Sequence, residues 1–464
     1  MKLRSTRTGY RTWAIPALGL LAVAAGSVVA WAQGAPPAAE APPAPARTLY
    51  NPAPETGNEF GHPVAFYGDD LLVAMAKDDG GVQQRGTVLQ LDTRSGALIR
   101  TFARPEKAAA ATAVPVRKKQ MPDEPVNSAV VSLLNVEDKV LVGMPYDDVG
   151  KQKFAGAVHV FNSHDGRLLR SLVVPGKAKG KPGALPVLEA RDSRIGSAIA
   201  MIDGHVLAGA PGVALRKRAE GPPVTVARAG VVFEFDLESG NVLNVLQKPD
   251  PASDDAFGTT LAVARGLILV GAPGEQGGGA VHAYNGGGGG VVVRSYKRAE
   301  GLATDGFATA LAATDHLVLV GAPGDGHAGR HSGAVYVFDA ARATLLRVLK
   351  SPTAAADDLF GYSVAAAGEG RIVIGAHGID KGAGAVLVLD SATGTLLQML
   401  KPPRSVPDAG FGMSVAVAGD RVAVSAHREP MGEVGTGVVY LLALPAGRAA
   451  SKPTAAAEPA KVQP

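Results

Sequence analysis

The sequence of 464 residues contains no cysteine, which excludes disulfide bonds, a lipid-anchored lipoprotein and cysteine catalysis. Aromatic residues are scarce at 5%, and both tryptophans, Trp13 and Trp31, lie in the first 32 residues. No convincing amphipathic helix stands in the central part of the chain. Glycine and proline are abundant instead, with 59 and 33 residues, and they favour many short strands joined by tight turns.

Acidic residues are also absent from the first 32 positions, which hold Lys2, Arg4, Arg7 and Arg11. Without these four, the 46 basic residues of the chain fall to 42, against 42 acidic residues. The formal net charge of +4 therefore belongs to this segment, and the remainder is close to neutral. The charge balance gives no reason to expect a nucleic-acid partner.

Residues 1–32 have the pattern of a secretory signal peptide. A basic start precedes an apolar run from Ala14 to Ala30, and small residues flank one position at Ala30-Trp31-Ala32. This pattern predicts cleavage after Ala32 and a periplasmic or secreted protein without a stable membrane span. The alternative is an uncleaved anchor, because the run is almost long enough to span a bilayer, although Pro16 interrupts it.

Two further segments are too rich in alanine and proline to bury a core. Residues 33–46 are expected to form a disordered linker, and residues 446–464 a disordered tail. Residues 47–445 between them predict strands and turns throughout.

Residues 47–445 contain seven copies of one pattern. Each copy opens on an apolar residue followed by a small one, continues through a short strand and a tight turn, and reaches Gly-Ala-Pro or a variant. The opening residue precedes this triplet by 14 positions in six copies, as from Phe257 to Gly271, and by 15 positions from Phe360 to Gly375. Seven copies with a spacing of 14 or 15 positions are not expected by chance. The regular positions of the repeat are Phe60, Gly61, Phe257, Gly258, Gly271, Pro273, Phe307, Gly321, Pro323, Phe360, Gly361, Phe411 and Gly412.

A third strand opens with Gly-x-Val in every copy, and a turn such as Asp390 to Gly394 leads into a fourth strand such as Leu396 to Leu400. Four antiparallel strands in each of seven copies predict an all-β, seven-bladed propeller. The small residue after the opening position fits the crowded axis of such a ring.

The seventh copy lacks a fourth strand after its third. An apolar residue of the fourth strand precedes the next opening residue by 11 positions, as Leu400 precedes Phe411, and Leu49 stands 11 positions before Phe60. Residues Arg47 to Tyr50 are therefore predicted to pair as the outer strand of the last blade. This pairing would close the ring and remove a free boundary.

These repeats resemble the FG-GAP repeats of integrin α-subunit propellers, and more closely their bacterial relatives, over about residues 47–442. The resemblance implies the propeller fold but not a particular activity. Integrin-type calcium loops lie between the first and second strands, where this chain has only tight turns such as Gly68-Asp69-Asp70. We expect no metal at that position and no cofactor.

No motif of a known catalytic or phosphate-binding type is present. His377 and His427 replace proline at the same position of adjacent copies, which indicates either drift at a turn or a two-histidine ligand site in need of further ligands. Acidic residues precede the opening position in six of seven copies, as Asp305 does. We interpret them as turn caps, or alternatively as an acidic ring on one rim.

The strongest functional indication lies in three extended loops of the first three copies, namely Ala103 to Pro125, Val173 to Arg194 and Val213 to Ala229. Loops carry function more often than scaffolds do, and together these form a candidate basic patch. The alternative is that these loops are solvated insertions without a binding role. The candidate ligand-binding residues are Lys107, Arg117, Lys118, Lys119, Lys177, Lys179, Lys181, Arg216, Lys217 and Arg218.

The sequence thus favours a monomeric, non-enzymatic binding or scaffold module for a protein or an anionic cell-envelope polysaccharide. The alternative is a propeller enzyme, either a polysaccharide lyase or a quinoprotein-like oxidoreductase. Quinoprotein blades carry tryptophan-rich motifs, whereas both tryptophans here precede the repeats. No clustered histidine, arginine and acid set of the lyase type stands out in the sequence.

Overall fold

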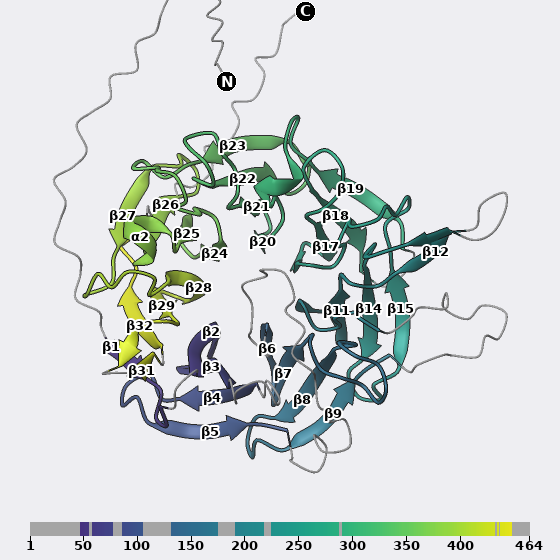
Figure 1. Cartoon of the computed structure of the whole chain (residues 1–464), viewed down its shortest axis with the longest axis horizontal. Coiled ribbons are helices and arrows are strands. Elements are labelled where there is room, and N and C mark those ends of the chain that lie inside the picture. The colour runs from purple at the N-terminus through teal and green to yellow at the C-terminus, as the bar shows by residue number, and fades with distance from the viewer. Residues whose placement is uncertain are drawn as a thin grey trace, which may run out of the picture. The chain divides into compact units, whose positions relative to one another are not determined.

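The computed structural model describes residues 47–54, 58–77, 86–104, 131–174, 191–217, 224–286, 290–431, 434–435 and 437–447. These residues belong to one compact unit, Pro42–Pro464. Within them, seven four-stranded sheets stand around a ring, as the repeat predicts (Figure 1). No helix of these described ranges is both long and apolar enough to cross a membrane.

The seven blades are numbered from the N-terminus; each of the first six is built from one copy of the repeat, and the seventh combines the last copy with the N-terminal strand. Their strands, from the innermost to the outermost, are as follows: blade 1, β2 (Asn58–Tyr67), β3 (Asp70–Lys77), β4 (Thr87–Leu91), β5 (Leu98–Phe102); blade 2, β6 (Ser132–Val136), β7 (Lys139–Met144), β8 (Ala157–Asn162), β9 (Leu168–Leu172); blade 3, β10 (Ile199–Ile202), β11 (His205–Ala210), β14 (Val231–Asp236), β15 (Val242–Leu246); blade 4, β16 (Leu261–Ala264), β17 (Leu267–Ala272), β18 (Ala280–Asn285), β19 (Val292–Tyr296); blade 5, β20 (Ala310–Ala313), β21 (Leu317–Ala322), β22 (Ala334–Asp339), β23 (Leu345–Leu349); blade 6, β24 (Ser363–Ala367), β25 (Arg371–Ala376), β26 (Ala385–Asp390), β27 (Leu396–Leu400); blade 7, β28 (Phe411–Ala418), β29 (Arg421–Ala426), β32 (Val438–Ala443), β1 (Arg47–Tyr50).

Short elements occupy some of the connections between these strands. They are the hairpins β12 (Leu215–Lys217) with β13 (Val224–Val226) and β30 (Pro430–Met431) with β31 (Val434–Gly435), and the single turns η1 (Ala303–Asp305) and α2 (Ile379–Gly382).

The ring closes through the strand at its N-terminal end. β1 pairs antiparallel with β32, with Leu49 opposite Val439, and so completes blade 7 as predicted. The innermost strands of neighbouring blades contact one another in an unbroken circle, which returns from β28 to β2 (Figure 1). Leu49 is 1% exposed and packs in the cluster that joins blades 7 and 1. The first and last repeats are therefore held by one shared sheet.

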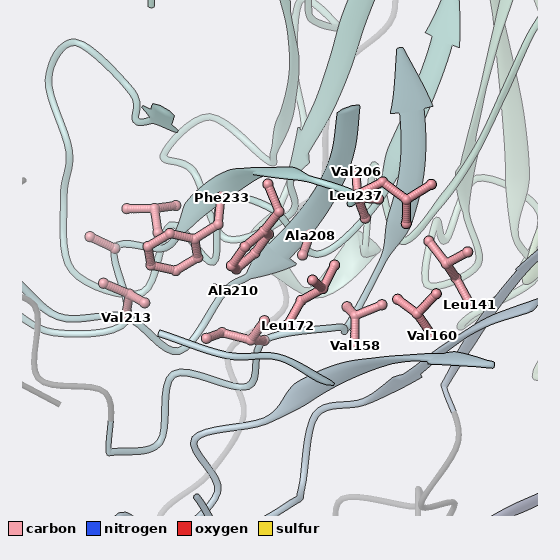
Figure 2. Close-up of a cluster of buried hydrophobic side chains, with 14 of the residues drawn as sticks. Leu141, Val158, Val160, Leu172, Val206, Ala208, Ala210, Val213, Phe233 and Leu237 are labelled. Atoms are coloured by element: carbon pink, nitrogen blue, oxygen red, sulfur yellow. The ribbon is translucent and has the colours of Figure 1, made fainter. Parts of the chain in front are cut away.

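The apolar core lies between the blades. The described residues form seven buried clusters, and each spans one pair of neighbouring blades. Figure 2 shows the pair of blades 2 and 3, where Val158 and Val160 of β8 face the side of the sheet that carries Val206 and Phe233. Because both faces of a blade are covered, the second strand is an apolar run rather than an alternating one. No blade buries both faces by itself, so the ring folds as a stack.

The glycines of the repeat fit one recurring contact near the axis. A Cβ atom at Gly375, on the second strand of blade 6, would lie 2.0 Å from the carbonyl oxygen of Gly412, which opens blade 7. Gly209 and Gly258 meet in the same way between blades 3 and 4. Gly258 and Gly412 also have φ values of +91° and +93°, where a side chain is strained. The two glycine positions of the motif therefore allow neighbouring backbones to approach closely.

Candidate functional site

The strand order gives the ring two different faces. In an antiparallel blade, the loop between the second and third strands and the linker to the next blade emerge at the same end. We call that end of the ring the loop face. The turns between the first and second strands and the hairpins between the third and fourth, such as Asp92 to Gly96, form the opposite end, which we call the hairpin face.

The predicted basic patch falls mainly outside the described residues. Arg216 stands on β12 and is exposed, and Lys217 ends the same strand. Within the loop expected from Val213 to Ala229, Leu215 to Lys217 pair with Val224 to Val226 as a hairpin. The remaining candidates lie outside the described residues: Lys107, Arg117, Lys118, Lys119, Lys177, Lys179, Lys181 and Arg218.

Three of the acidic residues before the opening positions serve as turn caps. The carboxylate of Asp305 accepts a hydrogen bond from the backbone of Leu302 at 2.9 Å. Asp255 and Asp358 accept the equivalent bonds at 2.7 Å, and all three side chains are buried. The interpretation as caps is confirmed for these three residues.

A buried carboxylate on the loop face joins some blades to the blade before them. In blade 4, Glu275 lies 2.6 Å from Nε2 of His282 and 2.6 Å from Nζ of Lys297. Lys248, which follows the last strand of blade 3, lies 3.4 Å from the same carboxylate and 2.8 Å from Asp255. The charges of two blades are thus neutralised at their boundary.

The same arrangement recurs in three other blades, and we call it a blade clasp. It combines a carboxylate after the second strand, a polar ring on the third strand and a cation that follows the last strand of the preceding blade. The distances from cation to carboxylate are 2.9, 3.5 and 3.0 Å in blades 2, 5 and 7. The members are Asp147, His159 and Arg104 in blade 2, Glu275, His282 and Lys248 in blade 4, Asp325, Tyr336 and Arg298 in blade 5, and Glu429, Tyr440 and Arg404 in blade 7.

Blades 3 and 6 use an apolar version of the clasp. Val213 and Phe233 take the two central positions in blade 3, and Val174 packs against them. Ile379 and Leu387 take the same positions in blade 6. Apolar residues thus replace the carboxylate and the polar ring together in blades 3 and 6. This replacement indicates that the clasps serve the packing between blades.

The electrostatics of the Glu275 clasp agree with a structural role. Burial alone would raise the pKa of the Glu275 carboxyl, but hydrogen bonds from His282 and Lys297 outweigh it and lower that pKa from 4.5 to about 2. The group is therefore a fixed anion, not a proton donor, at neutral pH.

The clasps were not predicted, although the sequence contains a signal for them. The carboxylate stands four positions after the first residue of the triplet, as Glu275 follows Gly271. The ring stands three positions after the glycine of Gly-x-Val, as His282 follows Gly279. The residue types at these two positions, taken together, distinguish the blades with a polar clasp from those with an apolar one.

A cluster of histidines lies on the loop face where blades 6, 7 and 1 meet. His377 and His427 follow β25 and β29, and His62 lies in the irregular part of β2 between Phe60 and Val64. The ring centroids of His62 and His427 are 6.0 Å apart, and those of Tyr362 and His377 are 4.3 Å apart in a T-shaped contact. The structure thus adds His62 and Tyr362 to the two histidines that the sequence singled out.

Burial keeps these histidines neutral. Burial, and then the positive charge of Arg428, lower the pKa of His62 and of His377 to about 4. For His427, burial and then the neighbouring His62 and Arg428 lower the pKa to about 3. Arg428 itself is exposed. At pH 7 the cluster therefore presents three uncharged rings beside one guanidinium group.

Residues 299–338 and 348–389 match the family model described as the FG-GAP repeat. The chain thus carries FG-GAP repeats within its seven-bladed propeller. The matched residues cover the first three strands of blade 5 and of blade 6, apart from the last residue of each third strand. No curated protein matches the chain. A crystal structure of the computationally designed Ika8 protein is similar at 18% identity over 85% of this chain and 98% of that chain, with a TM-score of 0.45.

The described part of the FG-GAP propeller does not bring together a metal-binding group of three or more histidine or acidic residues. The pair His377 and His427, considered above as a possible metal site, gains a third imidazole in His62 but no carboxylate ligand. The cluster therefore offers hydrogen-bond donors and acceptors together with the cation Arg428. Two candidates thus remain, the histidine cluster on the loop face of blades 6, 7 and 1 and the basic segments of blades 1 to 3, most of which lie outside the described residues.

Proposed function

We propose that this FG-GAP propeller is an exported, non-enzymatic binding or scaffold module that uses its loop face. Its ligand would be a protein or an anionic cell-envelope polysaccharide. The sequence of residues 1–32, with its basic start and apolar run, supports export. The propeller fold is one that serves binding and scaffolding, although a fold does not by itself define an activity.

The observation that carries this proposal is how the buried charges are used. The carboxylates of the four clasps contact cations and polar aromatic side chains of the propeller itself. Their apolar counterparts in blades 3 and 6 show that the same position can be occupied without a charge. The long basic segments of blades 1 to 3 belong to connections whose described ends lie on the loop face. Recognition by loops on a rigid frame is consistent with this division.

The proposal is tested by a pull-down with the processed chain, residues 33–464, against cell-envelope extracts over a series of salt concentrations. The Debye length falls from about 10 Å at 0.1 M to about 3 Å at 1 M ionic strength, so a partner held by the basic loops is released as salt rises. Absence of any salt-sensitive partner, together with turnover of a sugar polymer, would instead favour a propeller enzyme.

A further inference from the structure

Two positions of the repeat carry polar rings in blades 6, 7 and 1, the first of them in blades 1 and 6 and the second in blades 6 and 7. The residue after the opening pair carries a hydroxyl in blades 3, 4 and 5, where it closes the local turn. Ser197, Thr259 and Thr309 each donate to the backbone carbonyl three residues earlier, at 2.8, 2.7 and 2.8 Å. Blades 1 and 6 have His62 and Tyr362 at this position instead. These larger side chains replace a turn closure with a polar ring.

The third residue of the triplet changes in the same region. It is proline in blades 3, 4 and 5, at Pro211, Pro273 and Pro323, and histidine in blades 6 and 7. Drift at a turn would leave the new side chains scattered. Here the four changed positions converge, because ring closure places β2 of blade 1 against β28 and β29 of blade 7.

The cluster has polar capacity that the described residues do not use. The Nδ1 atoms of His377 and His427 are buried without a hydrogen-bond partner. Arg428 is exposed, and no carboxylate in the described part of the chain forms an ion pair with it. Its neighbour Glu429 is engaged in the clasp of blade 7 with Tyr440 and Arg404. The local charge is therefore a single cation without a counter-ion among these residues.

We infer that His62, His377, His427, Tyr362 and Arg428 form a binding site for one carboxylate group of a ligand. An anion is attracted by Arg428, whereas a metal ion would be repelled by it. A planar carboxylate accepts two parallel hydrogen bonds from a guanidinium group, and one arginine balances one negative charge. Tyr362 and the imidazole rings of the same cluster offer further donors to such a group.

This inference rests on the proposed binding role of the loop face but not on the basic loops of blades 1 to 3. It also gives the binding a pH dependence. Arg428 and burial keep the three imidazoles neutral, and Tyr362 adds no charge at neutral pH. A bound carboxylate opposes the field of Arg428 and favours protonated rings, so binding is linked to proton uptake. Binding therefore strengthens as the pH falls, until the ligand carboxylate itself takes up a proton at about pH 4.

The test is a histidine-detected NMR titration of the processed chain with two carboxylate probes, glucuronate and N-acetylglutamate. We expect the rings of His62, His377 and His427 to shift together and their pKa values to rise. Arg428→Gln should weaken binding by at least about tenfold, the equivalent of one pKa unit of interaction. Arg330→Gln is the matched control, because Arg330 is exposed on the loop face of blade 5 and paired with Asp357 at 2.7 Å.

A second pair of variants distinguishes the loss of the binding site from a loss of folding. His377→Pro and His427→Pro restore the residue found in blades 3, 4 and 5, so the ring should remain folded while probe binding is lost. A response to one probe only identifies a sugar or a peptide as the source of the carboxylate. If neither probe moves the rings, or if Arg428→Gln binds as the parent chain does, the site is refuted. Retained capture of envelope partners would then leave the proposed function standing without it.

Discussion

Replacement of Glu275 by valine tests whether the clasps act as exchangeable packing units. In the intact protein Glu275 is 6% exposed and contacts His282, Lys297 and Lys248. Lys297 is half-exposed and can return to solvent, and Lys248 keeps its contact with Asp255 at 2.8 Å. The main loss falls on His282, which is buried and keeps only its contact with a serine hydroxyl.

The expected cost follows from that inventory. A buried polar group that loses its partner costs about 1–3 kcal/mol, and breaking a buried ion pair costs about 3–5 kcal/mol. Since only part of the ionic set is broken, we expect Glu275→Val to lower the free energy of unfolding by about 3 kcal/mol.

The double variant Glu275→Val with His282→Phe installs the pair that blade 3 already has in Val213 and Phe233. Phe257, whose ring lies 6.2 Å from that of His282, offers the new phenylalanine an apolar neighbour. The double variant should therefore recover to within about 1–2 kcal/mol of the parent chain. The two substitutions would then be coupled by about 2 kcal/mol rather than additive.

Urea unfolding followed by circular dichroism measures these free energies, because the processed chain has no tryptophan to report on folding. The four proteins of the cycle must each unfold in one transition for the comparison to hold. Additive effects, or a double variant less stable than Glu275→Val, would refute the idea that polar and apolar clasps are interchangeable.

Three further predictions concern the stability of the propeller. Gly375→Ala places a Cβ 2.0 Å from the Gly412 carbonyl oxygen and should cost about 3 kcal/mol, whereas Gly419→Ala, with open space around it, should cost only about 1 kcal/mol, as urea unfolding would show. Leu49→Ala removes a buried side chain from the closing strand and should cost about 3 kcal/mol by the same measurement, and a neutral result would argue against closure through β1. The pKa of the Glu275 carboxyl is lower in the folded chain, about 2 against 4.5, so its contribution of about 3 kcal/mol is present above pH 4.5 and lost as pH falls towards 2. Unfolding measured across this pH range should show that dependence in the parent chain and not in Glu275→Gln.

The fold could be predicted because each blade repeats one local pattern. The fixed spacing from Phe257 to Gly271 identified the blade, and Leu49, 11 positions before Phe60, identified the closing strand. Both are relations within a short stretch of chain, so they need no knowledge of how blades stack. The glycine contacts across blade boundaries then explain why the spacing is so regular.

The clasps and the histidine cluster depend on contacts between blades. Lys248 and Glu275 belong to successive copies, and nothing in the linker between them reveals that the two side chains meet. His62 and His427 stand near opposite ends of the propeller and become neighbours only when β1 closes the ring. A prediction of that contact requires the closed geometry, whereas the repeat position of His427 was visible beforehand.

The most direct test of the account is a comparison of charge reversal on the two faces. One variant carries Arg117→Glu, Lys118→Glu and Lys119→Glu in the long loop of blade 1. The matched control reverses three exposed arginines of the hairpin face, Arg94, Arg167 and Arg342, whose side chains are 85%, 84% and 77% exposed. Their ion pairs are at the surface, where such pairs contribute about 0–1 kcal/mol, so the control should stay folded.

The quantity to measure is the affinity of each variant for the envelope polyanion or acidic protein that the parent chain captures at low salt. The account predicts a loss of at least about tenfold for the loop variant and an unchanged affinity for the hairpin variant. Equal losses from both variants would point to non-specific charge attraction. An unchanged affinity in the loop variant would contradict binding through the basic loops of this face.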